Sequence, residues 1–212
     1  MTAEPLFDSA ASAKLDAVYR TPDVVTQRHE TLIALRLGEG ERVLDVGSGP
    51  GLLAAEMAER VGQTGQVAGV DISPSMVRLA RQRCARTPIR DRIHFTRADA
   101  TALPFADSTF DAAVSTQVYE YVSDLRTAFA ELHRVLRHGG RVVIVDTDWD
   151  SIVWNAGDQA RMRQVLAAWT ERFADPHLPR TLARQLGDAG FVVHGCSALV
   201  LLNAGPGYDA NT

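Results

Sequence analysis

Acidic residues and glycines follow two neighbouring apolar stretches of the sequence at positions suited to binding a nucleoside. The stretch VLDVGSGPG (43–51) places Asp45 inside an apolar run and then three alternating glycines, Gly47, Gly49 and Gly51. A glycine-rich turn between a strand and a helix exposes backbone N–H groups and the positive end of the helix to a ligand. The turn therefore predicts a binding loop, although packing alone is an equally good explanation of such glycines.

Two further apolar stretches also end in acids. GVDIS (69–73) contains Asp71, and a carboxylate at the end of a second strand can accept hydrogen bonds from both hydroxyls of a ribose. ADATALPF (98–105) contains Asp99, which can accept from the exocyclic amine of adenine, and Ala100, whose N–H can donate to a ring nitrogen. These stretches indicate a nucleoside cofactor.

Other nucleotide-binding patterns fit this sequence less well. The dinucleotide pattern G-x-G-x-x-G would need a glycine where Leu52 stands, and a Walker A loop needs a lysine after its last glycine. Lys14 is the only lysine in the chain, which also weighs against short-chain dehydrogenase chemistry. An NAD(P)-dependent oxidoreductase is therefore the less favoured alternative.

Hydrophobic periodicity predicts a chain in which strands and helices alternate. Apolar runs predict strands at 42–47, 66–73, 93–99, 110–117, 141–147 and 191–202. Helical spacing predicts helices at 22–37, 51–62, 73–86, 125–136, 158–173 and 179–189. The pattern favours an α/β fold, a three-layer, doubly wound and mostly parallel sheet. A packing stripe is expected on the helix at 158–173, formed by Met162, Val165, Leu166, Trp169 and Phe173.

Five stretches together resemble the class I S-adenosylmethionine-dependent methyltransferases. They are VLDVGSGPG, GVDIS, ADATALPF, FDAAVSTQVYEYVSD (110–124) and LHRVLRHGGRVVIVD (132–146). The likeness covers about residues 25–147 and is closest to the ubiquinone/menaquinone-biosynthesis type. It implies a Rossmann-like sheet, S-adenosylmethionine as the cofactor, and methyl transfer to a small-molecule acceptor. A protein that binds S-adenosylmethionine but has an incomplete acceptor pocket is the alternative.

The resemblance also implies which residues hold the cofactor. Ile72 would lie against the adenine, and Met76 would cover the other side of the ring unless it is a helix-core residue. Gln117 would lie near the sulfonium, and Arg28 would meet the cofactor carboxylate unless it lies on a solvated helix face. The expected cofactor-binding residues are Arg28, Asp45, Gly47, Ser48, Gly49, Gly51, Asp71, Ile72, Met76, Asp99, Ala100 and Gln117.

Acidic and aromatic residues gather in DTDWDSIVWN (146–155), after the last core strand, where this fold places substrate contacts. A plain loop that buries its tryptophans is the alternative. The expected acceptor-binding residues are Tyr19, Tyr121, Asp148, Trp149 and Trp154. No catalytic residue is assigned, and the candidates for a general base are Asp148, His29 and His177. No metal site is predicted, since two cysteines are too few for a zinc centre.

Length and composition set the remaining expectations. The 212 residues fit a single S-adenosylmethionine-binding domain, with a helical cap at 1–37, a cofactor-binding core at 38–147, and substrate-side helices with the last strand at 148–212. A net charge of −4 speaks against nucleic acid as a partner. With no membrane span or secretory signal in the sequence, we expect a cytoplasmic monomer or homodimer.

The end of the chain departs from the family pattern. The family's sheet usually has seven strands, the last of them antiparallel, whereas the tail NAGPGYDANT (203–212) is rich in turn formers and has no strand pattern. We therefore expect either that the final antiparallel strand is missing or that the chain is truncated.

Overall fold

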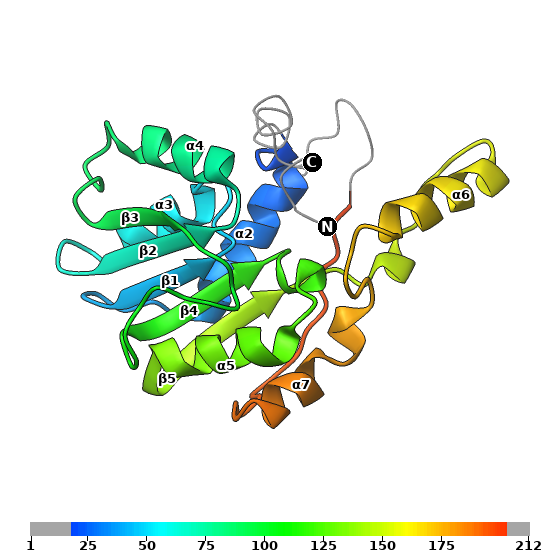
Figure 1. Ribbon diagram of the computed structural model, residues 1–212. Helices are drawn as coiled ribbons and strands as arrows, with labels where there is room; N and C mark the ends of the chain where they lie inside the picture. Colours follow the sequence, from blue (N-terminus) through cyan, green and yellow to red (C-terminus); the bar gives the residue numbers. More distant parts are fainter. Residues whose placement is uncertain (1–17, 203–212) are drawn as a thin grey trace.

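The computed structural model describes residues 18–202 and contains one sheet of five parallel strands (Figure 1). The strands are β1 (Arg42–Val46), β2 (Gln66–Asp71), β3 (Ile93–Arg97), β4 (Phe110–Thr116) and β5 (Leu136–Val145). Their order is β3-β2-β1-β4-β5, so the chain reverses its winding direction between β1 and β4. In open parallel sheets, ligands bind beyond the carboxyl ends of the strands at such a reversal point.

Helices cover both faces of the sheet and give the three layers that the sequence predicts (Figure 1). One face carries α2 (Pro22–Leu35), α3 (Leu52–Arg60) and α4 (Pro74–Cys84). The other carries α5 (Leu125–Val135) and α7 (Leu182–Asp188). Successive residues of a strand point to opposite faces, so Val43 joins the first core and Leu44 the second.

Local sequence explains where the helices beside the binding edge begin. Ser73 accepts a hydrogen bond from the Met76 amide at 3.4 Å, and Pro74 occupies the first helical position of α4, as predicted. Asp124 caps α5 by accepting from the Thr127 amide at 3.0 Å. These caps fix the turns after β2 and β4, which carry predicted site residues.

The fifth strand differs from its predicted bounds. Helix α5 ends at Val135, and β5 begins at Leu136 rather than at 141. Leu136 pairs with Phe110 and Arg141 pairs with Ala112, so residues 137–140 bulge out between the two pairs. The glycines at 139 and 140, which lie between the predicted helix and the predicted strand, allow this bulge.

The predicted sixth strand at 191–202 is wrong: none of these residues forms a strand. Phe191 packs into the core beside the His133 ring, but Val192 is 76% exposed and Val200 88% exposed. A strand needs a neighbour to bond its N–H and C=O groups, and apolar periodicity alone does not supply one. Within residues 18–202, β5 is therefore an edge strand, and no antiparallel strand follows it.

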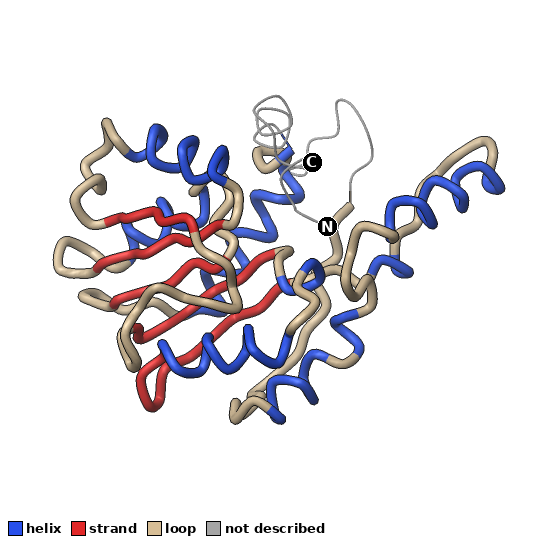
Figure 2. Tube along the Cα trace, viewed as in Figure 1, coloured by secondary structure: helices blue, strands red, loops and turns tan. Residues whose placement is uncertain are grey.

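The helix predicted at 158–173 is α6 (Gln159–Thr170), but its apolar stripe is not packed as expected. No residue of α6 is buried, and Val165 remains 45% exposed. Of the stripe, only Phe173 is buried, just beyond the helix. The tube in Figure 2 shows α6 extending away from the sheet, which leaves the stripe little described surface to pack on.

No helix among the described residues is long and apolar enough to cross a bilayer. The division into cap, core and substrate-side segments stays a prediction, and residues 1–17 of the predicted cap lie outside the described residues.

The packing makes a first prediction. Phe129 on α5 is 1% exposed and contacts the Tyr119 ring at 4.8 Å between centroids. Phe129→Ala should therefore lower the free energy of unfolding by about 3–5 kcal/mol. Val165→Ala on exposed α6 should change it by less than about 0.5 kcal/mol. Urea denaturation measures both, and similar losses in the two variants would contradict the packing described here.

Candidate functional site

The glycine loop, Gly47–Gly51, is packed closely at Gly47 and more loosely at Gly49. A Cβ atom at Gly47, where φ is +72°, would lie 2.1 Å from the Val118 side chain, so only glycine fits there. The Gly47 amide donates to the Val70 carbonyl at 2.8 Å, which holds the loop against β2. At Gly49, by contrast, the nearest atom to such a Cβ would be Tyr19 Cε2, at 3.9 Å. The loop is therefore less crowded at Gly49 than at Gly47, with the Tyr19 ring at ordinary contact distance.

Asp45 and Asp71 lie on neighbouring strands beside this loop, as the sequence predicts. Asp45 is 2% exposed, and its Oδ2 atom has no hydrogen-bond partner in the structure. Burial, and then the nearby Asp71, raise the pKa of Asp45 to about 7. Asp71 accepts from the amides of Gly49 and Ser73, both at 2.8 Å, but burial still raises its pKa. Two such carboxyl groups favour a ligand that brings hydrogen-bond donors or positive charge.

The other predicted adenosine contacts divide into two groups. Ile72 is 44% exposed at the tip of β2, and Asp99 lies at the end of the next strand, where it accepts from the Thr101 amide and hydroxyl at 2.9 and 2.8 Å. Ala100 is nearly buried beside it. Met76, however, is only 2% exposed within α4, which fits the alternative of a helix-core residue better than an adenine contact.

Arg28 and Tyr19 close one side of the glycine loop. Arg28 donates to the Glu56 carboxylate and to the Tyr19 carbonyl, both at 2.8 Å, so it is not on a solvated helix face. Burial, and then the charge of Asp71, raise the pKa of the Tyr19 hydroxyl. Tyr19 was predicted on the acceptor side, and the structure places it next to Gly49 and Asp71.

Gln117 follows β4 in an unusual backbone conformation, with φ at +58°. Its amide N–H donates to the Val145 carbonyl at 2.7 Å, and its side-chain nitrogen lies 2.8 Å from Thr147 Oγ1. A left-handed conformation is strained for a residue with a Cβ. The turn after β4 is thus held to the end of β5, beside the predicted sulfonium position.

Three aromatic side chains form what we call the aromatic wall: Tyr121, Trp149 and Phe173. Trp149 and Phe173 are stacked, with centroids 4.4 Å apart and planes at 23°, and Tyr121 lies 4.8 Å from Phe173. Trp169 of α6 extends the wall, 6.0 Å from Trp149. Tyr121 and Trp149 were predicted at the acceptor site, whereas Trp154 is 49% exposed and makes none of the ring contacts described for residues 18–202.

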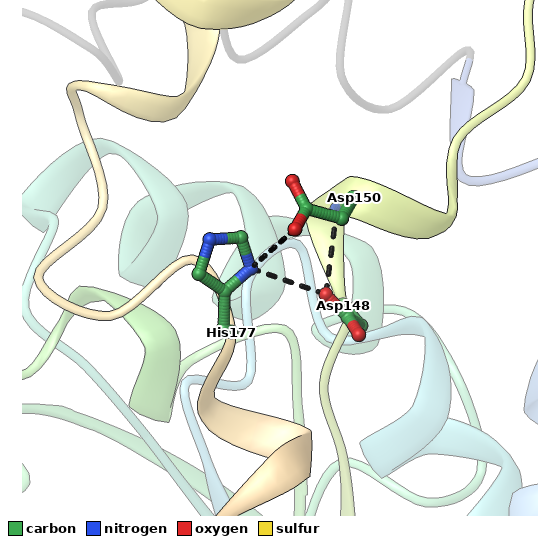
Figure 3. Close-up of side chains that lie close together, drawn as sticks. All are labelled: Asp148, Asp150 and His177. Carbon is green, nitrogen blue, oxygen red and sulfur yellow. Dashed lines mark hydrogen bonds and ion pairs between the residues drawn. The ribbon is translucent and has the colours of Figure 1, made fainter.

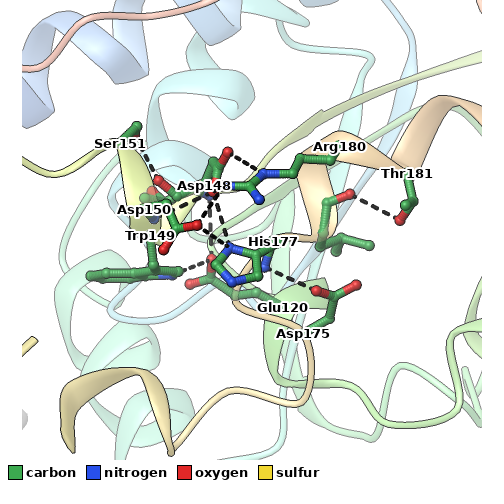
Figure 4. Close-up of polar contacts among 11 residues, drawn as sticks. Glu120, Asp148, Trp149, Asp150, Ser151, Asp175, His177, Arg180 and Thr181 are labelled. Atoms are coloured by element: carbon green, nitrogen blue, oxygen red, sulfur yellow. Dashed lines mark hydrogen bonds and ion pairs between the residues drawn. The ribbon is translucent and has the colours of Figure 1, made fainter. Parts of the chain in front are cut away.

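Glu120 is a residue that sequence reasoning missed. It is fully buried, and its Oε2 atom accepts from the Trp149 indole N–H at 2.9 Å (Figure 4). Burial raises the pKa of Glu120 to about 7, although the bonds from Trp149 and Thr147 lower it. Nearby Asp146 is partly buried, with its Oδ2 atom out of contact with water, and burial followed by the charge of Glu120 raises its pKa. An acid inside the apolar stretch VYEYV (118–122) was the clue in the sequence.

Two of the three base candidates come together in a charged cluster that we call the clasp: Asp148, Asp150, His177 and Arg180. Their contacts are shown in Figures 3 and 4. His177 Nδ1 lies 3.2 Å from Asp148 Oδ1, while Arg180 donates to both carboxylates at 2.7–3.0 Å. The bonds from Arg180 lower the pKa of Asp148. Burial acts in the opposite direction, but the bond from His177 adds to the lowering, so the pKa stays below its ordinary value.

The clasp also contains the atoms for a possible cation site, because one ligand atom from each of Asp148, Asp150 and His177 lies within 4.8 Å of the others. Arg180 already occupies both carboxylates, so a cation would have to displace it. The third base candidate, His29, is exposed on α2. None of the contacts described for residues 18–202 joins it to the clasp or to the aromatic wall.

Comparison with known proteins agrees with this geometry. The family model described as a methyltransferase domain matches residues 44–144. An O-methyltransferase from Penicillium expansum is 36% identical over 176 residues, covering 82% of this chain and 60% of the relative. A ubiquinone/menaquinone biosynthesis C-methyltransferase from Klebsiella pneumoniae is 36% identical over 107 residues, covering 50% of this chain and 43% of the relative.

A solved structure titled as a SAM-dependent methyltransferase from Aquifex aeolicus has a similar fold. The TM-score is 0.67 at 22% identity, covering 87% of this chain and 88% of that one. This likeness shows the fold. The chain spans 43–60% of the length of the two curated relatives above.

The two glycines predict different effects of substitution. Gly49→Ala should lower the free energy of unfolding by only about 1–2 kcal/mol, the cost of the left-handed backbone. It should weaken S-adenosylmethionine binding about tenfold or more, because the alanine side chain would occupy the place where the cofactor is expected to lie against the backbone. Gly47→Ala should cost about 2–5 kcal/mol, since it adds a clash with Val118. Calorimetric titration and urea denaturation separate the two, and unchanged affinity in Gly49→Ala would contradict the placement of the ligand.

Asp45 predicts how cofactor binding depends on pH. The ionised carboxylate should bind the positively charged cofactor best, so affinity should rise as the pH rises through about 7. Asp45→Asn should remove most of this dependence and weaken binding about 10- to 150-fold, as expected for a lost charge-assisted hydrogen bond of about 1.5–3 kcal/mol. Calorimetric titrations with S-adenosylmethionine at pH 6, 7 and 8 measure the affinity of the unaltered chain and of the variant.

The same substitution should stabilise the free protein at high pH. The folded-state pKa of Asp45 lies above its ordinary value, so this group's contribution to stability is greatest below about pH 4 and is lost as the pH rises through about 7. Asp45→Asn should therefore raise the Tm at pH 8 more than at pH 5. An equal change at both values would show that the carboxyl is not held out of water.

Proposed function

Because the chain belongs to the class I S-adenosylmethionine-dependent methyltransferases of the ubiquinone/menaquinone-biosynthesis-like type, we propose that it transfers a methyl group to a small-molecule acceptor. The observation that carries the proposal is the adjacency of two surfaces. Asp71 accepts from the Gly49 amide, and Tyr19 lies beside both. Burial, then Glu120 and then Tyr19 raise the pKa of Tyr121, so Tyr19 is within electrostatic range of the aromatic wall.

The residues present fit S-adenosylmethionine as the cofactor. Asp71 keeps lone pairs for the ribose hydroxyls, and Asp45 offers the unpartnered Oδ2 atom to the positively charged amino-acid end. With no side chain at Gly49, that end would lie against the backbone beside Tyr19. When bound, the cofactor would supply a methyl group that its positively charged sulfonium already activates.

The chain's own contribution is to position the acceptor and to keep water away. No covalent nucleophile is needed, because holding two reactants in line is itself worth up to about 7–11 kcal/mol in ideal cases. The aromatic wall offers flat apolar surface to a ring-containing acceptor, and aromatic faces favour a nearby cation by about 0.5–2 kcal/mol. Gln117 would lie near the sulfur, and His177 with Asp148 is the candidate for accepting a proton.

Binding and turnover together test this function. Calorimetric titration with S-adenosylmethionine, its demethylated product and NAD should show binding of the first two only. An acceptor panel then follows: 1,4-naphthohydroquinone, catechol and aniline, which offer carbon, oxygen and nitrogen to the methyl group. Transfer of labelled methyl to one of them supports the proposal. Cofactor binding without transfer would favour a binding protein with an incomplete pocket, and NAD binding would favour an oxidoreductase.

The two tryptophans predicted at the acceptor site should behave differently. Trp149→Ala removes a ring from the aromatic wall and should raise the acceptor KM up to about tenfold, the equivalent of a lost aromatic pair of about 0.5–1.5 kcal/mol. Trp154→Ala serves as the matched control and should change it less than twofold. Both should leave cofactor affinity unchanged. Equal effects of the two substitutions would show that the aromatic wall is not part of the acceptor site.

Location and assembly stay predictions: a cytoplasmic protein, a monomer or a homodimer, with no nucleic acid partner. Gel filtration of the full chain measures the assembly.

A further inference from the structure

A single buried residue, Glu120, contacts two stretches of the chain that carry the aromatic wall, residues 147–149 and 174–175. Its carboxylate accepts from the Trp149 indole N–H at 2.9 Å and from the Thr147 amide at 3.3 Å. Its backbone carbonyl accepts from the amides of Ala174 and Asp175 at 2.8 and 3.0 Å, directly after Phe173. Glu120 therefore contacts the chain on both sides of the stacked Trp149–Phe173 pair, as the indole and carboxylate in Figure 4 illustrate for one side.

A carboxylate is a costly group to use for this purpose. Glu120 is fully buried, and its Oε1 atom has no partner within the described residues. Asp146 lies close enough to interact with it electrostatically. An apolar residue would fill the same volume without removing a charge from water. The acid is therefore best explained by something that an apolar side chain cannot do, which is to accept the indole hydrogen bond.

Holding these two stretches together does not require that bond. The clasp already joins the loop after β5 to residues 177–180, with Arg180 bonded to Asp148 and Asp150. In addition, the Trp149 backbone amide donates to the Pro176 carbonyl at 3.0 Å. These contacts fix the backbone of Trp149, and stacking on Phe173 restrains the plane of its ring but not the direction of its N–H. Among the described contacts, the Glu120 hydrogen bond is the one that fixes the direction of the indole N–H.

We propose that Glu120 is a positioning residue for the acceptor: it fixes the direction of the indole N–H within the stack, and so holds the Trp149 ring against which a ring-containing molecule binds. The proposal rests on the proposed function for the identity of that molecule, but the orientation of the ring stands on the geometry alone. Gln117 is held in a parallel way by Thr147, so the turn after β4 orients two side chains of the site through its contacts with the end of β5.

The test uses Trp149 as its own reporter. The chain has three tryptophans, so Trp154→Phe with Trp169→Phe leaves Trp149 as the only indole. In that background we compare Glu120→Gln, which keeps an acceptor oxygen, with Glu120→Leu, which removes it. Near-ultraviolet circular dichroism reports how firmly the indole is held. Quenching of its fluorescence by menadione, a flat quinone used as the ring probe, gives a Kd.

We expect Glu120→Gln to keep the indole signal and bind menadione within about twofold of the background protein. Glu120→Leu should lose most of the signal and bind about tenfold more weakly, the equivalent of one hydrogen bond. Glu131→Leu is the control for a merely structural role, because Glu131 also holds a loop, through the Leu103 amide and Arg134, but away from the wall. It should destabilise the protein and leave both readouts unchanged.

Several outcomes would overturn the proposal: an unchanged indole signal in Glu120→Leu, unchanged menadione binding, or the same losses in Glu131→Leu. If Glu120→Leu does not fold, Trp149→Phe removes the same hydrogen bond from the other partner. Menadione binding to it, measured by calorimetry, should weaken similarly, and tight binding would count against the proposal. If the proposed function is wrong, the unaltered chain will not bind S-adenosylmethionine. The circular dichroism and quenching measurements still decide the role of Glu120 in that case.

Discussion

Carboxyl groups held out of water at one edge of the sheet are the constraint on which the site depends. Asp45 and Glu120 are almost fully buried at the ends of adjacent strands, and burial raises the pKa of each to about 7. Their cost is partly offset because strand ends, turns and helix N-termini meet at this edge and direct backbone amides toward it. Asp146 shows the arrangement, since it accepts from the Val118 amide at 2.9 Å. The parallel topology, with β1 beside β4, is what brings these groups together.

Much of the fold follows from the sequence because its elements are specified locally. Pro74 and Ser73 mark the start of α4, and apolar runs mark the five strands of the sheet. The errors occur where structure depends on a partner rather than on periodicity. Residues 191–202 have the composition of a strand but pair with nothing in the described chain, and the apolar stripe of α6 is left exposed apart from the contact of Trp169 with Trp149. Periodicity shows what a segment would bury, but not whether a neighbour exists.

The site shows the same division. Asp45, Asp71 and the glycine loop lie in short motifs at the ends of strands, where residue type and spacing already imply contact with a ligand. Glu120 bonds to Trp149 across 29 residues, and Arg180 bonds to Asp148 across 32. Neither pair has a fixed spacing in a motif, because the contacts depend on how the segment after β5 folds back. The sequence therefore implies the grouping of Asp45, Asp71 and the glycine loop, whereas the long-range contacts of Glu120 and Arg180 had to come from the structure.

The left-handed turn at Gln117 has a consequence for attempts to engineer this protein. A φ of +58° costs a residue with a Cβ about 1–2 kcal/mol relative to glycine. A screen for heat resistance would therefore reward glycine at this position and, with it, the loss of the amide that reaches Thr147. If Gln117 has the role near the sulfonium proposed above, variants selected for stability alone would lose turnover, and such a selection would also have to measure methyl transfer.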